Sequence, residues 1–352
     1  MPAFGEFAKK WNLDTALLGP VDNAYPFKLS ACMESLIGQK GDAIWKQFVP
    51  DADELADDSG LDDPLSEESL SPVPNLVHRY PNRVLWLVHD RCAVHCRFCT
   101  RKRRWRAGCS SAAGGDLGPA LDYIRRNPQI RDVLLSGGDP LLLPMERLRE
   151  ILQKLREIEH VDIVRIGSRV PGALPRKITP ELAGMLGRFH PIYLNLHFNH
   201  PAELTAEARE ACSLLANAGI PLGSQTVLLR GVNDSEAVLG TLFHGLLAMR
   251  VRPYYLMQMD LTRSTAHFRT PVGTGLRILK HLRNRISGLA MPHFVIDLPG
   301  GNGKVALVPQ VVRRIGDGEL VVENYLGKRC TYPLLDGEET ELRRFLQRGE
   351  NG

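Results

Sequence analysis

The sequence contains no apolar run that approaches the roughly 18 residues of a membrane-spanning helix. Its opening, MPAFGEFAKKWNLD, has no apolar signal core, so a cytoplasmic protein without a membrane partner is expected. Neither sign of charge dominates, because 44 Lys and Arg against 40 Asp and Glu leave a net charge of +4. That balance gives no indication of nucleic-acid binding. With 43% hydrophobic and 24% charged residues, the composition excludes collagen and wholesale disorder and is typical of a soluble enzyme.

Cysteine is too scarce, at seven in 352 residues, for a small protein held together by disulfides. Three of the seven, Cys92, Cys96 and Cys99, nevertheless share one short segment in C-x3-C-x2-C spacing. Such a group indicates metal or cofactor ligation in a reducing compartment. Three thiolates can hold a [4Fe–4S] cluster and leave one iron open, whereas structural zinc normally needs a fourth Cys or His at motif spacing. We predict the cluster, with a non-enzymatic zinc-binding module as the alternative, and no role for Cys32, Cys109, Cys212 and Cys330.

A chain of 352 residues is long enough for about two domains of roughly 150 residues each. We expect an N-terminal helical extension over residues 1–75, a catalytic core over residues 76–290 and a C-terminal segment over residues 291–352. Residues 51–68 hold nine acidic residues and no basic one, which is typical of a solvated connection.

From residue 83 onward, short β-branched apolar runs alternate with segments of helical period. Helices are expected at residues 145–159 and 202–218, the second closed by Gly219. The predicted strands are residues 83–90, 131–136, 161–166, 192–198, 221–229 and 252–259. Six such units in about 200 residues predict an α/β fold, a partial TIM-like (βα)6 barrel, with a doubly wound sheet as the alternative. In either fold, active residues gather at the carboxyl ends of the strands.

A glycine-rich segment near the C-terminus, DLPGGNGK, ends at Lys304. It fails as a phosphate-binding P-loop, because Leu298 and Val305 occupy positions where that motif requires Gly and Ser or Thr. A lysine in such a turn can form a Schiff base with pyridoxal phosphate (PLP).

The cysteine spacing after the first strand, with LLSGGD ending the second, resembles the radical S-adenosylmethionine (SAM) superfamily. Together with HRYPNRVLWLV, RIGSRVPGALP, LNLHFNHP and VIDLPGGNGK, these motifs resemble the lysine 2,3-aminomutase family, the PLP-dependent branch, over roughly residues 75 to 310. The resemblance implies four groups of site residues. They are Cys92, Cys96 and Cys99 for the cluster; Ser136, Gly137, Gly138, Asp139, His197 and Gln225 for SAM; Arg79, Tyr80, Arg83 and the Schiff-base Lys304 for PLP; and Arg101, Asp260 and Asp297 for the substrate.

The activity implied is an isomerase reaction that interconverts L-lysine and L-β-lysine by moving the amino group from C2 to C3. Asp260 and Asp297 would meet the ε-ammonium of the substrate, and Arg101 would bind its carboxylate. Alternatives are the same migration on arginine, ornithine or glutamate, and β-lysine synthesis for elongation factor P. A different class, a radical SAM enzyme that modifies protein or RNA, has only the basic run at residues 101–106 in its favour.

The family's clostridial members bind zinc through C-terminal cysteines and a cysteine after RGVND. Here Ser235 follows that motif and the tail contains only Cys330, so we expect no zinc site. The resemblance therefore implies a homo-oligomer, with a dimer favoured over a zinc-linked tetramer. It also implies an electron donor such as flavodoxin or ferredoxin.

Overall fold

A nine-stranded sheet in chain order forms the centre of the molecule, which a computed structural model describes over residues 4–56, 59–105 and 115–347. Strands β2 to β8 pair in parallel, whereas β1 and β9 lie antiparallel at the two edges. The strands are β1 (Leu76–Tyr80), β2 (Arg83–His89), β3 (Asp132–Gly137), β4 (Ile163–Ser168), β5 (Ile192–Leu196), β6 (Leu222–Leu228), β7 (Val251–Gln258), β8 (His293–Leu298) and β9 (Gly303–Leu307). Cys109 lies outside the described residues.

The predicted barrel is confirmed, and its six predicted strands correspond to β2 through β7. The structure adds a seventh parallel strand, β8, which pairs with β7 through Tyr255 and His293. Strand β9 then runs back beside β8 and places Lys304 opposite Asp297. Lys304 and the cysteine loop are therefore both positioned by the same sheet.

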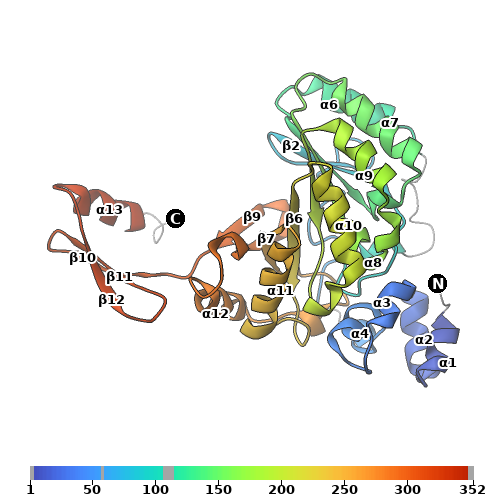
Figure 1. The fold of residues 1–352 in the computed structure, drawn as a ribbon, viewed down its shortest axis with the longest axis horizontal. Helices are drawn as coiled ribbons and strands as arrows, with labels where there is room; N and C mark the ends of the chain where they lie inside the picture. The colour runs from blue at the N-terminus through green and yellow to red at the C-terminus, as the bar shows by residue number, and fades with distance from the viewer. Residues whose placement is uncertain (1–3, 57–58, 106–114, 348–352) are drawn as a thin grey trace.

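Helices cover the outside of the sheet, as Figure 1 shows for α9, α10 and α11. Leu148, Ile151 and Leu152 on α7 are fully buried and pack in one core with Val133 and Leu135 of β3. Along β3 and β6 the alternate positions face away from this helical layer, into the barrel. The helices of this layer are α6 (Gly118–Arg126), α7 (Met145–Arg156), α8 (Val170–Ala173), α9 (Pro180–Leu186), α10 (Ala206–Asn217), α11 (Glu236–Ala248) and α12 (Val272–Leu282).

Helix α10 begins four residues later than its period predicts. Pro201–Glu203 form a separate 3-10 turn, and Thr205 then caps the helix by accepting a bond from Ala208 N–H. The predicted end is confirmed, since Gly219 follows it with φ of 79°, a conformation that favours glycine.

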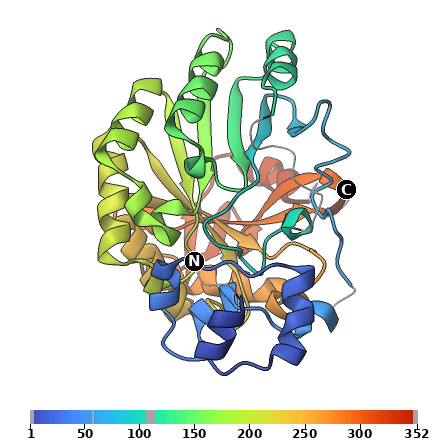
Figure 2. The same ribbon diagram turned by 90° about the vertical axis from the view of Figure 1, so that its right-hand side faces the viewer.

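The N-terminal helices pack across the end of the barrel that carries the cysteine loop (Figure 2). Phe7, Met33 and Phe48 form one buried cluster with Ala93 and Val94 of that loop. These helices are α1 (Phe4–Lys10), α2 (Thr15–Ala24), α3 (Ala31–Ser35), α4 (Ala43–Phe48) and α5 (Asp53–Ala56).

The interpretation of residues 51–68 as a solvated connection is wrong for two of its carboxylates, whereas Asp51, Asp53, Asp62 and Glu68 are exposed. Glu54 is 0% exposed and Glu67 only 4%. Both carboxylates accept hydrogen bonds from basic side chains of the cysteine loop. These two carboxylates therefore pair with the basic loop inside the protein, which composition alone does not reveal.

The C-terminal residues form a second, three-stranded antiparallel sheet, which extends away from the barrel in Figure 1. Its elements are β10 (Val312–Gly316), β11 (Glu319–Glu323), β12 (Arg329–Pro333) and the following helix α13 (Glu338–Gln347). Within the described ranges, no helix has the length and apolar character needed to cross a membrane.

Candidate active site

The three cysteines occupy the loop that follows β2, at the carboxyl end of the parallel strands. Burial raises the pKa of all three thiols, and that of Cys99 reaches about 11, with the charge of Cys96 adding to the effect. Cys92 is affected by both Cys96 and Cys99 in the same way, so the three sulfurs lie near one another. A cation or an iron cluster would be needed to hold them as thiolates in this buried place.

Two N–H groups already point at these sulfurs. Arg169 Nη1 donates to Cys96 Sγ at 3.0 Å, and the backbone N–H of Arg101 lies 3.4 Å from Cys99 Sγ. Hydrogen bonds to sulfur are one of the ways in which a protein tunes an iron–sulfur cluster. Among the described residues, no group of three or more His, Cys, Asp or Glu side chains could hold a metal ion. Three thiols on one loop can each ligate a different iron of a [4Fe–4S] cluster, so the residue types present fit such a group.

Gly137 and Gly138 allow the end of β3 to press against the start of the cysteine loop. A Cβ on Gly137 would stand 2.0 Å from the carbonyl oxygen of His89, and one on Gly138 would stand 2.3 Å from that of Arg91. The backbone N–H of Asp139 donates to the Arg91 carbonyl at 2.7 Å. The motif thus fixes the first turn of the loop that begins at Cys92.

Asp139 itself is buried and joins the ends of β3 and β4. Its carboxylate accepts bonds from Ser168 Oγ at 2.8 Å, Arg169 N–H at 2.7 Å and Leu141 N–H at 3.1 Å. Burial raises the pKa of Asp139 in spite of these donors. The structure therefore gives this carboxylate a scaffolding role, and its predicted contact with SAM stays a prediction.

His197 follows β5, and Gln225 lies within β6, the next strand around the barrel. The His197 ring lies 5.6 Å from that of Phe98 on the cysteine loop, and its Nε2 pairs with Asn199 Oδ1 at 3.1 Å. Burial lowers the pKa of His197 to about 3, so the ring is neutral at physiological pH. Gln225 occupies an inward-facing position of β6. Both placements are compatible with the predicted SAM pocket, which remains a prediction.

The residues predicted to hold PLP gather where the two edge strands approach each other. Tyr80 Oη, at the end of β1, accepts a bond from the backbone N–H of Lys304 on β9 at 2.9 Å. The Arg83 guanidinium stacks 3.8 Å over the Tyr80 ring. Asp297 binds the Lys304 ammonium, and Arg79 Nη1 lies 3.4 Å from the same carboxylate. Two arginines, a phenol and a lysine together fit an aldehyde cofactor that carries a phosphate.

Arg101 lies on the other side of the site, and its partner is a residue that the sequence did not indicate. Glu67 accepts bonds from Arg101 Nε at 3.0 Å and from Nη2 at 2.6 Å. Arg101 Nη1 donates to Ser136 Oγ at 3.2 Å. Nη1 also lies 3.5 Å from the Gly137 carbonyl oxygen, so each of the three guanidinium nitrogens of Arg101 has a partner.

Asp260 follows β7 and lies close to Asp297. Burial and the charge of Asp297 raise the pKa of Asp260 to about 7, against the opposing effects of Lys304 and Arg79. A carboxylate that lies near a second carboxylate in a poorly solvated site favours a cation as its ligand. The fold therefore brings the predicted substrate-binding pair, Asp260 and Asp297, close together.

Arg169 is a further residue that sequence reasoning missed. Besides Cys96, it donates from Nη2 to Glu203 Oε2 at 2.8 Å and to Gln47 Oε1 at 2.7 Å. Its motif, RIGSRVPGALP, carried part of the resemblance, but no pattern in the sequence links it to a cysteine 73 residues away. Only the end-to-end alignment of parallel strands reveals this proximity.

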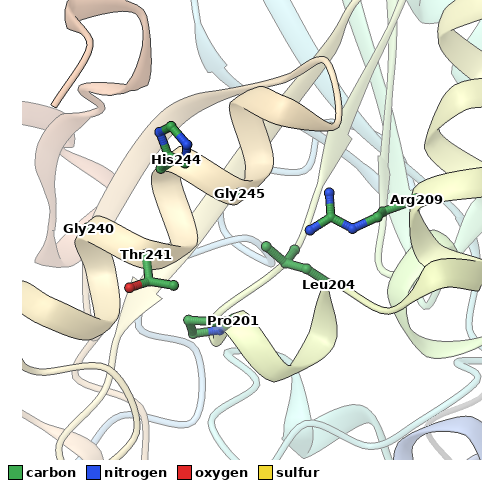
Figure 3. A pocket seen from close by; sticks show the side chains of 7 residues that line it. All are labelled: Pro201, Leu204, Arg209, Gly240, Thr241, His244 and Gly245. Atoms are coloured by element: carbon green, nitrogen blue, oxygen red, sulfur yellow. The ribbon is translucent and has the colours of Figure 1, made fainter.

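A groove of about 460 Å³ on the outer helical layer contains none of the predicted site residues (Figure 3). It lies between α10, α11 and the turn that precedes α10, with Leu204 directed toward Gly245. We assign it no part in the chemistry. Its lining residues are Pro201, Leu204, Arg209, Gly240, Thr241, His244 and Gly245.

The fold and the cysteine loop define a class, and comparison with known families agrees. The model of the radical SAM superfamily matches residues 86–239, and one described as lysine-2,3-aminomutase matches residues 279–341. Membership of that superfamily implies a [4Fe–4S] cluster and SAM.

Curated relatives define the family within this class. The chain is 52% identical over 290 residues to L-lysine 2,3-aminomutase of Fusobacterium nucleatum, covering 82% of this chain and 68% of the relative. It is 51% identical to that of Clostridium subterminale, covering 83% and 70%. Glutamate 2,3-aminomutase of Clostridioides difficile is 42% identical, with 82% and 68% covered. The chain belongs to the lysine 2,3-aminomutase family and is an isomerase.

Proposed function

We propose that this enzyme interconverts L-lysine and L-β-lysine, with PLP held on Lys304. The observation that carries the proposal is the half-buried acid pair Asp260 and Asp297. Asp297 binds the ammonium of Lys304, so the site already accommodates the charged end of a lysine side chain. A substrate that brings its own ε-ammonium would satisfy the cation demand of the pair.

Each end of the substrate has a partner in this arrangement. Arg101 binds the substrate carboxylate in place of its contacts with Ser136 and Gly137, while Asp260 and Asp297 hold the ε-ammonium. Arg79, Tyr80 and Arg83 bind the cofactor phosphate and ring. When bound, SAM at the cluster supplies the radical that removes a hydrogen from the substrate, and PLP carries the migrating nitrogen. The protein fixes the distance between these groups and excludes water.

Electrostatics favours lysine over glutamate. The second carboxylate of glutamate would approach these two carboxylates, and like charges at short range in a poorly solvated site repel strongly. Ornithine and arginine carry a cation and remain the alternative substrates.

The proposed chemistry also indicates the compartment and the electron donor of the enzyme. The thiolate ligands and a cluster that must be reduced require a reducing compartment and an electron donor, for which we propose the cytoplasm and a flavodoxin- or ferredoxin-type protein. We also propose a homo-oligomer, because the C-terminal segment leaves the apolar side chains of Leu326 and Leu335 68% and 80% exposed.

Replacing Lys304 tests the PLP assignment. We expect Lys304→Ala to abolish β-lysine formation while the iron content per chain stays unchanged, because the cysteine loop is held by other residues. Lys328→Ala, at an exposed position of the C-terminal segment, is the control and should retain turnover. Full activity of Lys304→Ala would contradict the proposed role.

A further inference from the structure

One buried carboxylate from the acidic segment holds two cations of the cysteine loop. Glu54, on α5, accepts bonds from Arg97 Nε at 2.8 Å and Nη2 at 2.7 Å, and from Lys102 Nζ at 2.6 Å. Arg97 stands between Cys96 and Cys99, and Lys102 follows Cys99 by three residues. In the sequence, Arg97 and Lys102 therefore stand on either side of Cys99, one of the three thiols.

The charged side chains of Glu54, Arg97 and Lys102 are all buried. Side-chain exposure is 0% for Glu54 and Arg97 and 2% for Lys102. The remaining donors are also satisfied, since Arg97 Nη1 donates to the carbonyl of Tyr25 at 2.9 Å and Lys102 Nζ to that of Ser264 at 3.1 Å. The geometry is thus fixed from several sides.

The charges of Glu54, Arg97 and Lys102 do not cancel. One carboxylate against two cations leaves a surplus of one positive charge beside the thiols. The backbone N–H of Lys102 donates to the carbonyl of Cys99 at 3.2 Å, and Arg97 directly follows Cys96, so both cations belong to the turn that carries these thiols. In a poorly solvated interior, such a charge acts on its neighbours far more strongly than it would at the surface.

We propose that Glu54, Arg97 and Lys102 form a charge clasp that sets the reduction potential of the cluster held by Cys92, Cys96 and Cys99. This inference rests on the cluster part of the proposed function and does not depend on PLP or on the amino-acid substrate. In the step concerned, the oxidised cluster takes one electron from a low-potential reductant and becomes more negative by one charge. The two cations favour that step and Glu54 opposes it.

Replacing the anion of the clasp and replacing one of its cations should shift the midpoint potential in opposite directions. This result separates an electrostatic role from a merely structural one. Glu54→Gln removes a negative charge and should raise the midpoint potential. Lys102→Met removes a positive charge and should lower it. A role confined to folding would change the amount of iron bound and leave the potential of the loaded protein unaltered.

The test is an EPR-monitored redox titration at pH 7 of the full-length protein, reconstituted anaerobically with iron and sulfide, with iron content measured in parallel. Asp162→Asn is the matched control, because Asp162 pairs with Arg131 on the surface, at the opposite end of the strands, and its potential should equal that of the wild type. Shifts up for Glu54→Gln and down for Lys102→Met support the clasp.

Equal potentials in the wild type and both variants, at full iron content, would overturn the proposal. If Glu54→Gln fails to fold, Lys102→Met decides alone, because Glu54 keeps its two bonds to Arg97 there. A wild-type chain that binds no iron would overturn the cluster assignment, whereas a loaded chain with shifted potentials but no turnover would contradict only the proposed substrate or PLP site.

Discussion

Individual charges in this enzyme are buried in partnered groups. Arg101 is held by Glu67 and Lys304 by Asp297, while Glu54 holds two cations of the cysteine loop. A buried charge is tolerated only when such partners replace its hydration. Asp260 differs from these groups, because it lies near Asp297, a group of its own sign. An acid in that situation is the residue most ready to accept a cationic ligand.

Asp260 gives the reaction a definite pH dependence. Its pKa of about 7 is raised, so the carboxylate is protonated below that pH and becomes an anion above it. Since kcat/KM reports the ionisation of the free enzyme, kcat/KM for lysine should fall as the pH drops below about 7, approaching tenfold per pH unit. The measurement is kcat/KM between pH 6 and 9.

Asp260→Asn should lose this acidic limb and show low kcat/KM throughout. Asp162→Asn, remote from the site, should keep the wild-type profile. An acidic limb that persists unchanged in Asp260→Asn would show that another group is responsible.

Sequence reasoning identified the residues that belong to motifs and missed their partners. The cysteine spacing and the glycine-rich turn point to Cys92 and Lys304 because local chemistry requires them. Glu67 is separated from Arg101 by 34 residues, and Glu54 from Arg97 by 43. Nothing in an acid-rich segment distinguishes the two carboxylates that are buried from those that remain in water.

At the scale of secondary-structure elements, the ends of the strands position the residues of the candidate active site. The β-branched runs predicted β2 to β7 well because a buried parallel strand needs apolar side chains on both faces. The seventh strand, β8, was missed because it begins at exposed His293 and contains Asp297 just before the turn at Pro299–Gly301. Between β3 and the cysteine loop, two glycines replace side chains with direct backbone contact.

Gly138→Ala tests that contact. The added Cβ would stand 2.3 Å from the Arg91 carbonyl oxygen, so either β3 or the start of the cysteine loop must move. Overpacking of this kind costs about 1–3 kcal/mol. We expect a lower melting temperature and less iron per chain after reconstitution.

Gly184→Ala is the matched control for this change. Gly184 lies inside α9, and an added Cβ there meets nothing within 4 Å. Because alanine is the better helix former by about 0.5–1 kcal/mol, this variant should be at least as stable as the wild type and bind as much iron. Normal iron loading in Gly138→Ala would contradict the role given to the close approach.

At the scale of the whole molecule, the nearly closed barrel brings the ends of the core together. The edge strands β1 and β9 meet through Tyr80 and Lys304, so the site is assembled from segments more than 200 residues apart, with a separation of 224 for this pair. The N-terminal helices cover the end that carries the cysteines. The barrel was predictable from its repeating pattern, whereas this cover was not, because short helices contacting a distant loop leave no periodic signal.

The most direct test of the account is the choice of amino acid. The full-length protein would be reconstituted anaerobically with iron, sulfide, PLP and SAM, reduced, and offered lysine, ornithine, arginine and glutamate separately, with each β-isomer measured by chromatography. The acid pair Asp260 and Asp297 predicts a β-isomer from lysine and none from glutamate. A β-isomer from glutamate, or from another amino acid with none from lysine, would contradict the proposed function.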